Sequence, residues 1–331
     1  MLKIGFIGLG GMGRHQAYAF SRVRSARIVA GADPFATGRK AFAAQHPGAM
    51  LYEDHRKLLK DTNVDAVVIA VPTGHHKAVT IDALRSGRPV LVEKPAARTV
   101  AQVRRMIEQA RRSRKLLMVA QCRRYDPIWG VIAAQLRKNR IGRPVLWRHV
   151  SAGRGPGGWF MDDRMGGGPL LDGAVHDHDF CNWMFGDPVS VMARGIKLNP
   201  GVTASDTVSA SVQYASGDQS MFSWSWCTPG GGVHDLLGPK GSLIGGPGDL
   251  VVPKAKAGRP VFCHTDMKGR QKLLFPSSSR SMYENQARHF IECVEKGIAC
   301  RSPATESVKA VAVGDAILKA AVRGGVRRVS W

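Results

Sequence analysis

"LKIGFIGLGGMGRHQAYAF", residues 2–20, decides the fold of this chain. It predicts an apolar β-strand over residues 2–7, then a glycine turn, and then a helix. Gly8, Gly10 and Gly13 follow the G-x-G-x-x-G pattern of turns that bind a dinucleotide. In this pattern the first glycine permits the tight turn, the second lets the backbone approach a pyrophosphate, and the third lets the helix pack closely on the strand. The N–H groups at the start of the helix, with Gly11 and Met12, would then meet the phosphates.

A second predicted strand, "ARIVAGAD", ends at Asp33, twenty residues after Gly13. A carboxylate at this place accepts hydrogen bonds from the adenosine ribose and repels a 2′-phosphate, so Asp33 favours NAD over NADP. The alternative is that Asp33 only caps the helix that follows. Arg39 and Lys40 lie nearby in the sequence, and they leave NADP open as the cofactor.

Further short apolar strands are predicted at "DAVVIAVP", "RPVLVEKP" and "KLLMVAQ", with helical segments between them. This alternation predicts an α/β domain with a doubly wound parallel sheet that is covered on both faces. Ligands bind beyond the carboxyl ends of such strands. The residues at those ends are therefore our candidates for binding the cofactor: Val71, Pro72, His75, His76, Glu93, Lys94, Gln121 and Arg124.

Residues 166–180, "GGGPLLDGAVHDHDF", crowd three aspartates and two histidines together and allow two interpretations. The first is a metal site, because "HDHD" supplies part of an H-x-H-x-D-H pattern. Position 180 is Phe, however, and we find no obvious partner set of ligands elsewhere. The second is an acid/base pair on a helix, which Pro169 begins and "FGDP" ends. On such a helix, one face carries Asp172, His176, Asp179 and Trp183. We therefore predict an acid/base site and no metal.

From about Arg123 the pattern changes to segments that alternate apolar and small polar residues. They predict an α+β domain with an open, mainly antiparallel sheet, including a hairpin turn at residues 216–218. Aromatic residues in "FSWSW" are expected on its open face, where they favour self-association. The glycine-rich loop at residues 151–168 carries Arg154 and Trp159, and it is either a segment that closes over substrate or an ordinary surface loop.

The composition limits the class of protein. A chain of 331 residues allows two domains, which we place at 1–122 and 123–331, and the closing helices of the second can pack back toward the first. The six cysteines form no C-x-x-C pair, which excludes a zinc ribbon. We find no apolar stretch of membrane-spanning length and no leader, so we expect a cytoplasmic protein without membrane contact.

The net charge of +23 raises the question of nucleic-acid binding. The basic residues are spread along the chain, with only modest clusters at "RMIEQARRSRK" and "RGGVRRV" and no basic arm. This distribution favours a generally basic surface that attracts anionic ligands. Nucleic acid stays the alternative partner.

The chain resembles the glucose–fructose oxidoreductase/inositol dehydrogenase (Gfo/Idh/MocA) family over nearly its whole length. The motifs that carry the resemblance are the glycine turn, "EKP" at residues 93–95, "VAQCRRYDP", "GGGPLLDGAVHDHD" with its D-x-x-x-H-x-x-D spacing, and "SMYENQARHFIECVEKG". One run departs from the family. Its usual Thr-Pro-Asn-like segment reads "VPTGHH" here, which leaves the cofactor contacts of His75 and His76 open.

The resemblance implies a Rossmann domain followed by a domain with an open sheet, a homodimer or homotetramer formed through that sheet, and often a cis peptide before Pro95. It also implies hydride transfer between a nicotinamide cofactor and a hydroxyl of a sugar, inositol or related polyol, with Lys94, Asp172 and His176 as the catalytic set.

We expect His176 to take the hydroxyl proton, since a histidine with an ordinary pKa of about 6.5 suits this exchange. Asp172 would orient His176 or bind a neighbouring hydroxyl, and Lys94 would stabilise charge on the reacting oxygen. The reverse assignment, with Lys94 as base and His176 as relay, stays open. Further candidates for binding substrate are Arg124, Arg154, Trp159, Asp179 and Tyr283.

Two other functions stay open within the same superfamily. One is cleavage of a glycosidic bond by an enzyme that retains NAD and oxidises its substrate only transiently. The other is a non-catalytic protein that binds NAD and senses a ligand.

Overall fold

The computed structural model describes residues 1–246, 261–276 and 278–331 of the chain. These residues form two compact units. The first contains residues 1–125 and 280–308, and the second contains residues 126–279 and 309–331. The sequence-based division at residue 122 allowed the closing helices to pack back toward the first domain, and residues 280–308 belong to the first unit. No helix of the described residues is both long and apolar enough to cross a bilayer.

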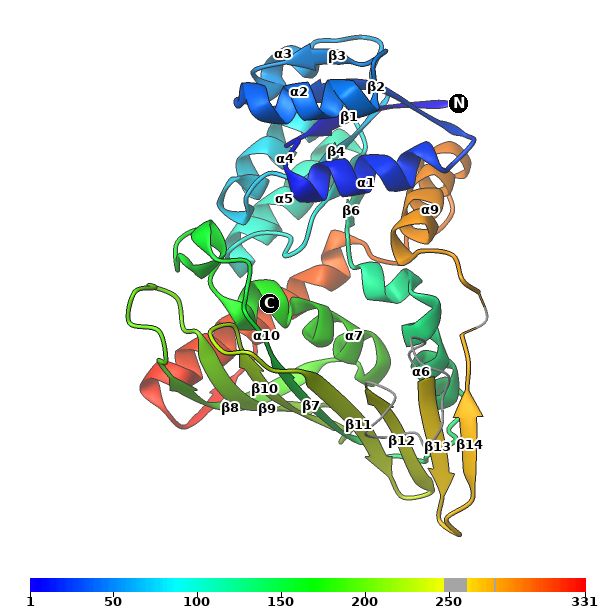
Figure 1. Cartoon of the computed structure of the whole chain (residues 1–331), viewed down its shortest axis with the longest axis vertical. Coiled ribbons are helices and arrows are strands. Elements are labelled where there is room, and N and C mark those ends of the chain that lie inside the picture. The colour runs from blue at the N-terminus through cyan, green and yellow to red at the C-terminus, as the bar shows by residue number, and fades with distance from the viewer. Residues whose placement is uncertain (247–260, 277) are drawn as a thin grey trace. The chain divides into compact units, whose positions relative to one another are not determined.

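Residues 1–125, all of which the structure describes, form a six-stranded parallel sheet in the order β3-β2-β1-β4-β5-β6 (Figure 1). The strands are β1 (Leu2–Ile7), β2 (Ala26–Ala32), β3 (Met50–Tyr52), β4 (Ala66–Ile69), β5 (Val90–Val92) and β6 (Leu117–Val119). Strands β4, β5 and β6 are buried along their whole length, as expected where helices cover both faces. The strand order reverses direction between β1 and β4, which is where sheets of this kind bind ligands. The predicted doubly wound fold is confirmed.

The helices of the first unit follow the strands in alternation. They are α1 (Gly11–Ser21), α2 (Ala36–Gln45), α3 (His55–Leu58), η1 (Thr73–His75), α4 (His76–Arg85), α5 (Val100–Ser113) and η2 (Cys122–Tyr125). Late in the chain, α9 (Met282–Lys296) adds its apolar face to the same core, where Phe290 packs edge-on against Phe20 at 6.1 Å between ring centres. This face follows the 3.6-residue period of a half-buried helix.

Among the described residues of the second unit, nine strands form a sheet in the order β14-β13-β12-β11-β7-β10-β9-β8-β15 (Figure 1). The strands are β7 (Leu146–Ala152), β8 (Pro188–Ile196), β9 (Thr207–Tyr214), β10 (Gln219–Ser225), β11 (Gly232–Gly238), β12 (Gly241–Gly246), β13 (Val261–Asp266), β14 (Gln271–Leu274) and β15 (Val326–Arg328). Neighbouring strands are antiparallel except β7 and β10, which run parallel. The predicted turn at residues 216–218 joins β9 to β10, with Gly217 at a φ of 85°. The mainly antiparallel sheet is thus confirmed.

The remaining elements of this part of the chain are helical. They are α6 (Pro127–Arg137), η3 (Gly158–Met161), η4 (Pro169–Gly173), α7 (Val175–Phe185) and α10 (Ala304–Arg323). Phe180 of α7 contacts Trp147 of β7 edge-on at 5.6 Å, so α7 packs against one face of the sheet.

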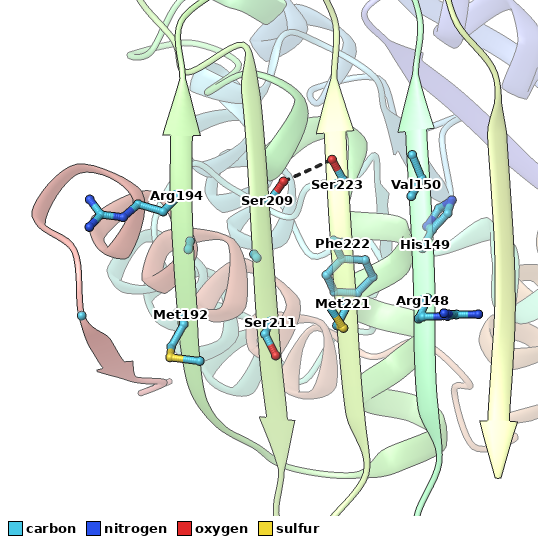
Figure 2. A pocket seen from close by; sticks show the side chains of 13 residues that line it. Arg148, His149, Val150, Met192, Arg194, Ser209, Ser211, Met221, Phe222 and Ser223 are labelled. Carbon is cyan, nitrogen blue, oxygen red and sulfur yellow. Dashed lines mark hydrogen bonds between the residues drawn. The ribbon is translucent and has the colours of Figure 1, made fainter.

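The two faces of this sheet differ sharply in composition. Phe222 and Trp224 of β10 lie on the face that packs against the helices and are buried, so the expectation of aromatic residues on the open face is wrong. Alternation along β10 sends Met221 and Ser223 to the open face instead (Figure 2). The large aromatic side chains take the helix-covered face because burial there removes more apolar area from water.

Candidate active site

The glycine turn between β1 and α1 has the geometry that a dinucleotide-binding fold requires at two of its glycines. Gly8 has a φ of 90°, and a Cβ there would lie 2.6 Å from the carbonyl carbon and oxygen of Ala70. A Cβ on Gly13 would lie 1.9 Å from the carbonyl oxygen of Gly8. Both positions therefore exclude any other residue, because the backbones of the turn, β4 and α1 approach too closely.

Gly10 is different, because a Cβ there would meet no atom of the described residues within 4 Å. The fold itself does not require glycine at this position, whereas a pyrophosphate lying against the backbone does. Gly10 is also the N-cap of α1, and within the described residues no side chain caps this helix end and no acidic residue stands in its first turn. The N–H groups of Gly11 and Met12, both exposed, thus begin a helix whose positive dipole end suits phosphate oxygens.

Asp33 follows β2 and is buried against the glycine turn. Its Oδ2 accepts a hydrogen bond from the backbone N–H of Leu9 at 2.8 Å, and its Oδ1 accepts one from Phe35 N at 2.8 Å. Each carboxylate oxygen has a further lone pair that can accept a ribose hydroxyl. Arg39 lies beside Asp33 with its guanidinium already engaged, since it donates to the carbonyl oxygen of Asp33 and to Glu53 Oε1, both at 2.8 Å. Asp33 thus fits an unphosphorylated ribose.

Lys94 lies in the loop after β5, next to the buried side chain of Glu93. Glu93 is 6% exposed, and its Oε1 accepts a 2.7 Å hydrogen bond from Gln16 Nε2 of α1. Its Oε2 accepts from the backbone N–H of Lys94 at 3.1 Å. The Lys94–Pro95 peptide is cis, as the resemblance implied. Gln16, which the sequence did not single out, therefore fixes the loop that carries Lys94; its only signal in the sequence is a polar residue on the buried face of α1.

His76 joins the same loop to the end of β4. Its Nδ1 lies 2.8 Å from the carbonyl oxygen of Pro95, and its Nε2 lies 2.8 Å from the carbonyl oxygen of Val71. The ring is 1% exposed. His76 thus positions the backbone of this edge of the sheet with both ring nitrogens. His75, by contrast, is exposed at the end of η1, and Pro72 and Val71 are partly exposed just before it.

Beyond β6, Gln121 and Arg124 are both buried. Within the described residues, neither the Nε2 nor the Oε1 atom of Gln121 has a hydrogen-bond partner. A buried amide of this kind is costly unless a ligand or water satisfies it, so Gln121 fits a cofactor contact.

Two candidates for binding substrate are engaged with other residues of the first unit. One Nη of Arg124 donates to the carbonyl oxygen of Arg301 at 2.7 Å. Tyr283 of α9 lies edge-on to His15 at 4.4 Å between ring centres.

In the second unit, the segment that carries Asp172 and His176 is not the single α-helix that the sequence predicts. Gly168, with a φ of 76°, leads into a π-helical turn at Pro169–Gly173, in which Ala174 N donates to the carbonyl oxygen of Pro169 at 2.7 Å. The α-helix α7 begins only at Val175 and ends at Phe185, before Gly186 with a φ of 85°. The π turn replaces the first turn of the single α-helix that the sequence predicts, and the common face of Asp172, His176, Asp179 and Trp183 stays a prediction.

The ionisable residues of this segment differ in how far they are exposed to solvent. Asp172, Asp177, His178 and Asp179 are each at most 2% exposed, whereas His176 is partly exposed. His178 Nε2 lies 3.1 Å from the carbonyl oxygen of Leu170, so His178 ties α7 to the π turn. Asp177 Oδ1 lies 3.0 Å from Nδ1 of His149 on β7. These two contacts assign structural roles to Asp177 and His178.

The glycine-rich loop before the π turn is anchored by aromatic contacts. Trp159 stacks on Phe160 with 3.7 Å between ring centres, and Phe160 lies edge-on to Trp226 at 6.4 Å. Arg154 is exposed and forms an isolated β-bridge with Cys227. The loop thus holds Trp159 in place but leaves the guanidinium of Arg154 at the surface.

Three side chains of the kinds that bind metals lie close together at positions that the sequence did not indicate as a metal site. His289 and Cys293 of α9 and Cys300 after it bring their donor atoms within 4.8 Å of one another. His289 Nε2 already accepts the backbone N–H of Arg301 at 2.9 Å and lies 3.3 Å from Cys293 Sγ. Burial raises the pKa of Cys293 and raises the pKa of Cys300 to about 12, so both thiols stay protonated. The cluster is satisfied as neutral side chains.

Comparisons with known proteins agree with this architecture. Residues 2–121 match the profile of the Gfo/Idh/MocA oxidoreductase family with its NAD-binding Rossmann fold, and residues 131–244 match the profile of that family's C-terminal domain. The chain is 33% identical over 211 residues to an inositol 2-dehydrogenase of Rubrobacter xylanophilus, in an alignment that spans 61% of this chain and 58% of that protein. It is 28% identical over 331 residues to an inositol 2-dehydrogenase of Rhizobium meliloti, which covers 96% of both proteins.

A solved structure of a candidate myo-inositol dehydrogenase from Sinorhizobium meliloti resembles this one with a TM-score of 0.82, at 25% identity and with 100% of both chains covered. The fold, the glycine turn and two profiles of one family agree over more than half of the sequence. The chain belongs to the Gfo/Idh/MocA family of oxidoreductases and has its NAD-binding Rossmann domain at residues 2–121.

Proposed function

We propose that the protein is an NAD-dependent dehydrogenase that moves a hydride between the carbon of a secondary hydroxyl on a sugar, inositol or sugar derivative and the nicotinamide. The observation that carries the proposal is the burial pattern of residues 172–179, where His176 alone among the aspartates and histidines is partly exposed. Relatives that are inositol 2-dehydrogenases support the substrate class.

The residues that would hold NAD lie at the carboxyl edge of the parallel sheet. The backbone at Gly10, Gly11 and Met12 would receive the pyrophosphate, and Asp33 the adenosine ribose. The amide of Gln121 would be satisfied by the nicotinamide end. When bound, the nicotinamide supplies the acceptor for the hydride.

We assign the proton and the charge of the reacting hydroxyl to this chain's own side chains. His176 takes the hydroxyl proton as the hydride leaves carbon, because an imidazole can gain and lose a proton near neutral pH. Lys94 donates a hydrogen bond to the reacting oxygen and stabilises its developing negative charge. Asp172 orients His176 or binds an adjacent hydroxyl. Further candidates for contacts with the substrate are Asp179, Trp159, Arg154, Arg124 and Tyr283.

The open face of the second unit's sheet supports a homo-oligomer. One cross-strand row of this face runs Met192, Ser211, Met221 and Arg148, from β8 through β9 and β10 to β7 (Figure 2). The row continues to Asp235 of β11, which pairs with Arg148. Met192 is 55% exposed and Met221 is 48% exposed, and the small side chain of Ser211 lies between them. A second copy of this face would cover these methionines and remove apolar area from water.

All six cysteines are free thiols, which fits our proposal of a cytoplasmic enzyme.

The test is a screen for reduction of NAD and, separately, NADP over inositols, aldoses and glycosides. The proposal predicts steady NADH formation with at least one polyol and a preference for NAD. Cleavage of a glycoside without net NADH formation would contradict it in favour of an enzyme that oxidises only transiently. Binding of NAD with no turnover of any of these substrates would contradict it in favour of a sensor.

A further inference from the structure

A cavity of about 190 Å³ in the second unit gathers positive charge away from every residue assigned above. It lies between the end of α6 and the hairpin of β13 and β14, and it is lined by Gln135, Lys138, Arg140, His264, Lys272 and Leu274. No aspartate or glutamate is among the described residues that line it. We propose that this cavity binds the phosphate group of a small ligand.

The strands bring two of the donors together. His264 of β13 and Lys272 of β14 are directly paired across the hairpin, so their side chains project from the same face. The next pair on that face is Phe262 with Leu274, and Phe262 is buried. The Nε2 atom of His264 is buried and has no hydrogen-bond partner among the described residues. A nitrogen in this position is costly unless a ligand or water satisfies it, and it can donate to a phosphate oxygen.

The end of α6 supplies the remaining cations. Asn139, with a φ of 51°, donates its N–H to the carbonyl oxygen of Leu136 at 3.0 Å, and Arg140 N donates to that of Gln135 at 3.1 Å. These bonds close the helix in a Schellman arrangement and occupy two of its last carbonyl groups. Lys138 and Arg140 follow there, as cations often do at a helix C-terminus. That preference does not account for Lys272 and His264, which reach the same cavity from the sheet.

Phosphate fits this donor set better than other ligands do. Two ammonium groups and a guanidinium carry three positive charges, and the imidazole and the Gln135 amide add further N–H donors. A phosphate monoester brings close to two negative charges and three strong acceptor oxygens, which can use donors from several sides. Lysine and arginine are the usual phosphate partners, lysine as a point charge and arginine as a fork. A carboxylate would leave more of the positive charge uncompensated.

The experiment is isothermal titration of the full chain with inorganic phosphate and, in parallel, with glucose 6-phosphate, at constant ionic strength held with sodium chloride. We expect saturable binding by the wild-type protein. The double variant Lys138→Ala/Lys272→Ala should weaken it at least about tenfold, since it removes two charge-assisted contacts to the phosphate oxygens. A matched control, Lys57→Ala/Lys268→Ala, removes two exposed cations outside the cavity and should bind within about twofold of wild type.

Tighter binding of glucose 6-phosphate than of inorganic phosphate would identify a phosphorylated metabolite as the ligand, and equal or weaker binding would identify the free ion. Equal phosphate binding by wild type and the double variant would overturn the proposal, because the ion would then sit elsewhere, for example at the glycine turn. An absence of saturable binding to wild type would overturn it too. His264→Gln leaves the lysine and arginine side chains of the cavity in place. It should weaken phosphate binding without lowering the thermal midpoint of unfolding. This guards against a loss caused by unfolding.

Discussion

His76 Nδ1 lies 2.8 Å from the carbonyl oxygen of Pro95. The other ring nitrogen lies equally close to the carbonyl oxygen of Val71, so one buried imidazole bridges the backbone after β4 and the backbone after β5. Carbonyl oxygens only accept hydrogen bonds, and a neutral imidazole has a single N–H. Both contacts are hydrogen bonds at the same time only when the ring is an imidazolium. His76 is therefore a positioning residue for the loop that carries Lys94.

Replacing His76 should impair catalysis through this loop. His76→Ala removes both bridges, and we expect the free energy of unfolding to fall by about 1–3 kcal/mol and kcat to fall about tenfold or more, because a small displacement of Lys94 is costly. His76→Gln keeps one donor and should recover part of kcat. Steady-state kinetics and chemical unfolding measure the two effects. A His76→Ala enzyme with wild-type kcat would show that the bridge has no part in positioning.

Asp33 should set the choice between NAD and NADP. Asp33→Asn keeps an acceptor for the N–H of Leu9 or Phe35 but removes the negative charge. Because hydrogen bonds to a charged group are stronger than neutral ones, we expect kcat/KM for NAD to fall roughly tenfold. The discrimination against NADP should fall as well, since repulsion of the 2′-phosphate is lost. Kinetics with both cofactors provide the measurement, and an unchanged ratio would count against this role of Asp33.

The stability of the first unit should fall in mild acid because of His289. Burial, and then the charge of Arg301, hold the pKa of His289 below its ordinary value of 6.5. As the pH falls below about 6.5, the unfolded chain binds a proton that the folded chain does not. The free energy of unfolding then decreases by at most about 1.4 kcal/mol per pH unit, and this contribution is fully present above that pH.

His289→Gln isolates this contribution, because its side-chain oxygen can still accept the N–H of Arg301. Chemical unfolding of both proteins at a series of pH values should show a shallower acid slope for the variant. Identical slopes would mean that the pKa of His289 is the same in the folded and the unfolded chain, which contradicts this prediction.

The open face of the sheet should control the oligomeric state. Met221→Arg places a cation on an exposed position whose cross-strand neighbour is Arg148. Beside Arg148 the new cation costs an isolated protomer little, because both side chains are exposed, and it brings further like charges together when a second copy covers the face. Sedimentation velocity should show a shift to monomer. Met267→Arg, at a 73% exposed methionine in the β13–β14 turn, should sediment as wild type. A monomeric wild-type protein would contradict the proposed assembly.

The sequence predicted most of the first unit because its signals are local. The glycine spacing at Gly8 and Gly13 reflects backbone contacts that exclude every side chain, and these leave a fixed pattern. The π turn at Pro169–Gly173 has no comparable pattern, since it differs from an α-helix by one hydrogen-bond register.

Contacts between distant segments left no signal that could be found in one sequence. Gln16 and Glu93 are 77 residues apart, and their hydrogen bond arises only when folding brings α1 close to the residue that follows β5. The aromatic residues of β10 were assigned to the wrong face because alternation fixes two faces but does not say which one the helices cover. Burial of His178 and Asp177, and so the separation of His176 from its neighbours, likewise depends on packing of α7 against the sheet.

The measurement that tests the central claim most directly is the single-turnover rate of NAD reduction by wild type, Lys94→Ala and His176→Ala, on a polyol found in the screen. NAD affinity of each protein is measured in parallel. We predict that His176→Ala lowers the rate about 10²–10⁴-fold and that Lys94→Ala lowers it about 10²–10³-fold, with His176→Ala binding NAD as wild type does. Rates of both variants within about threefold of wild type would contradict the assignment of the reaction to these two side chains.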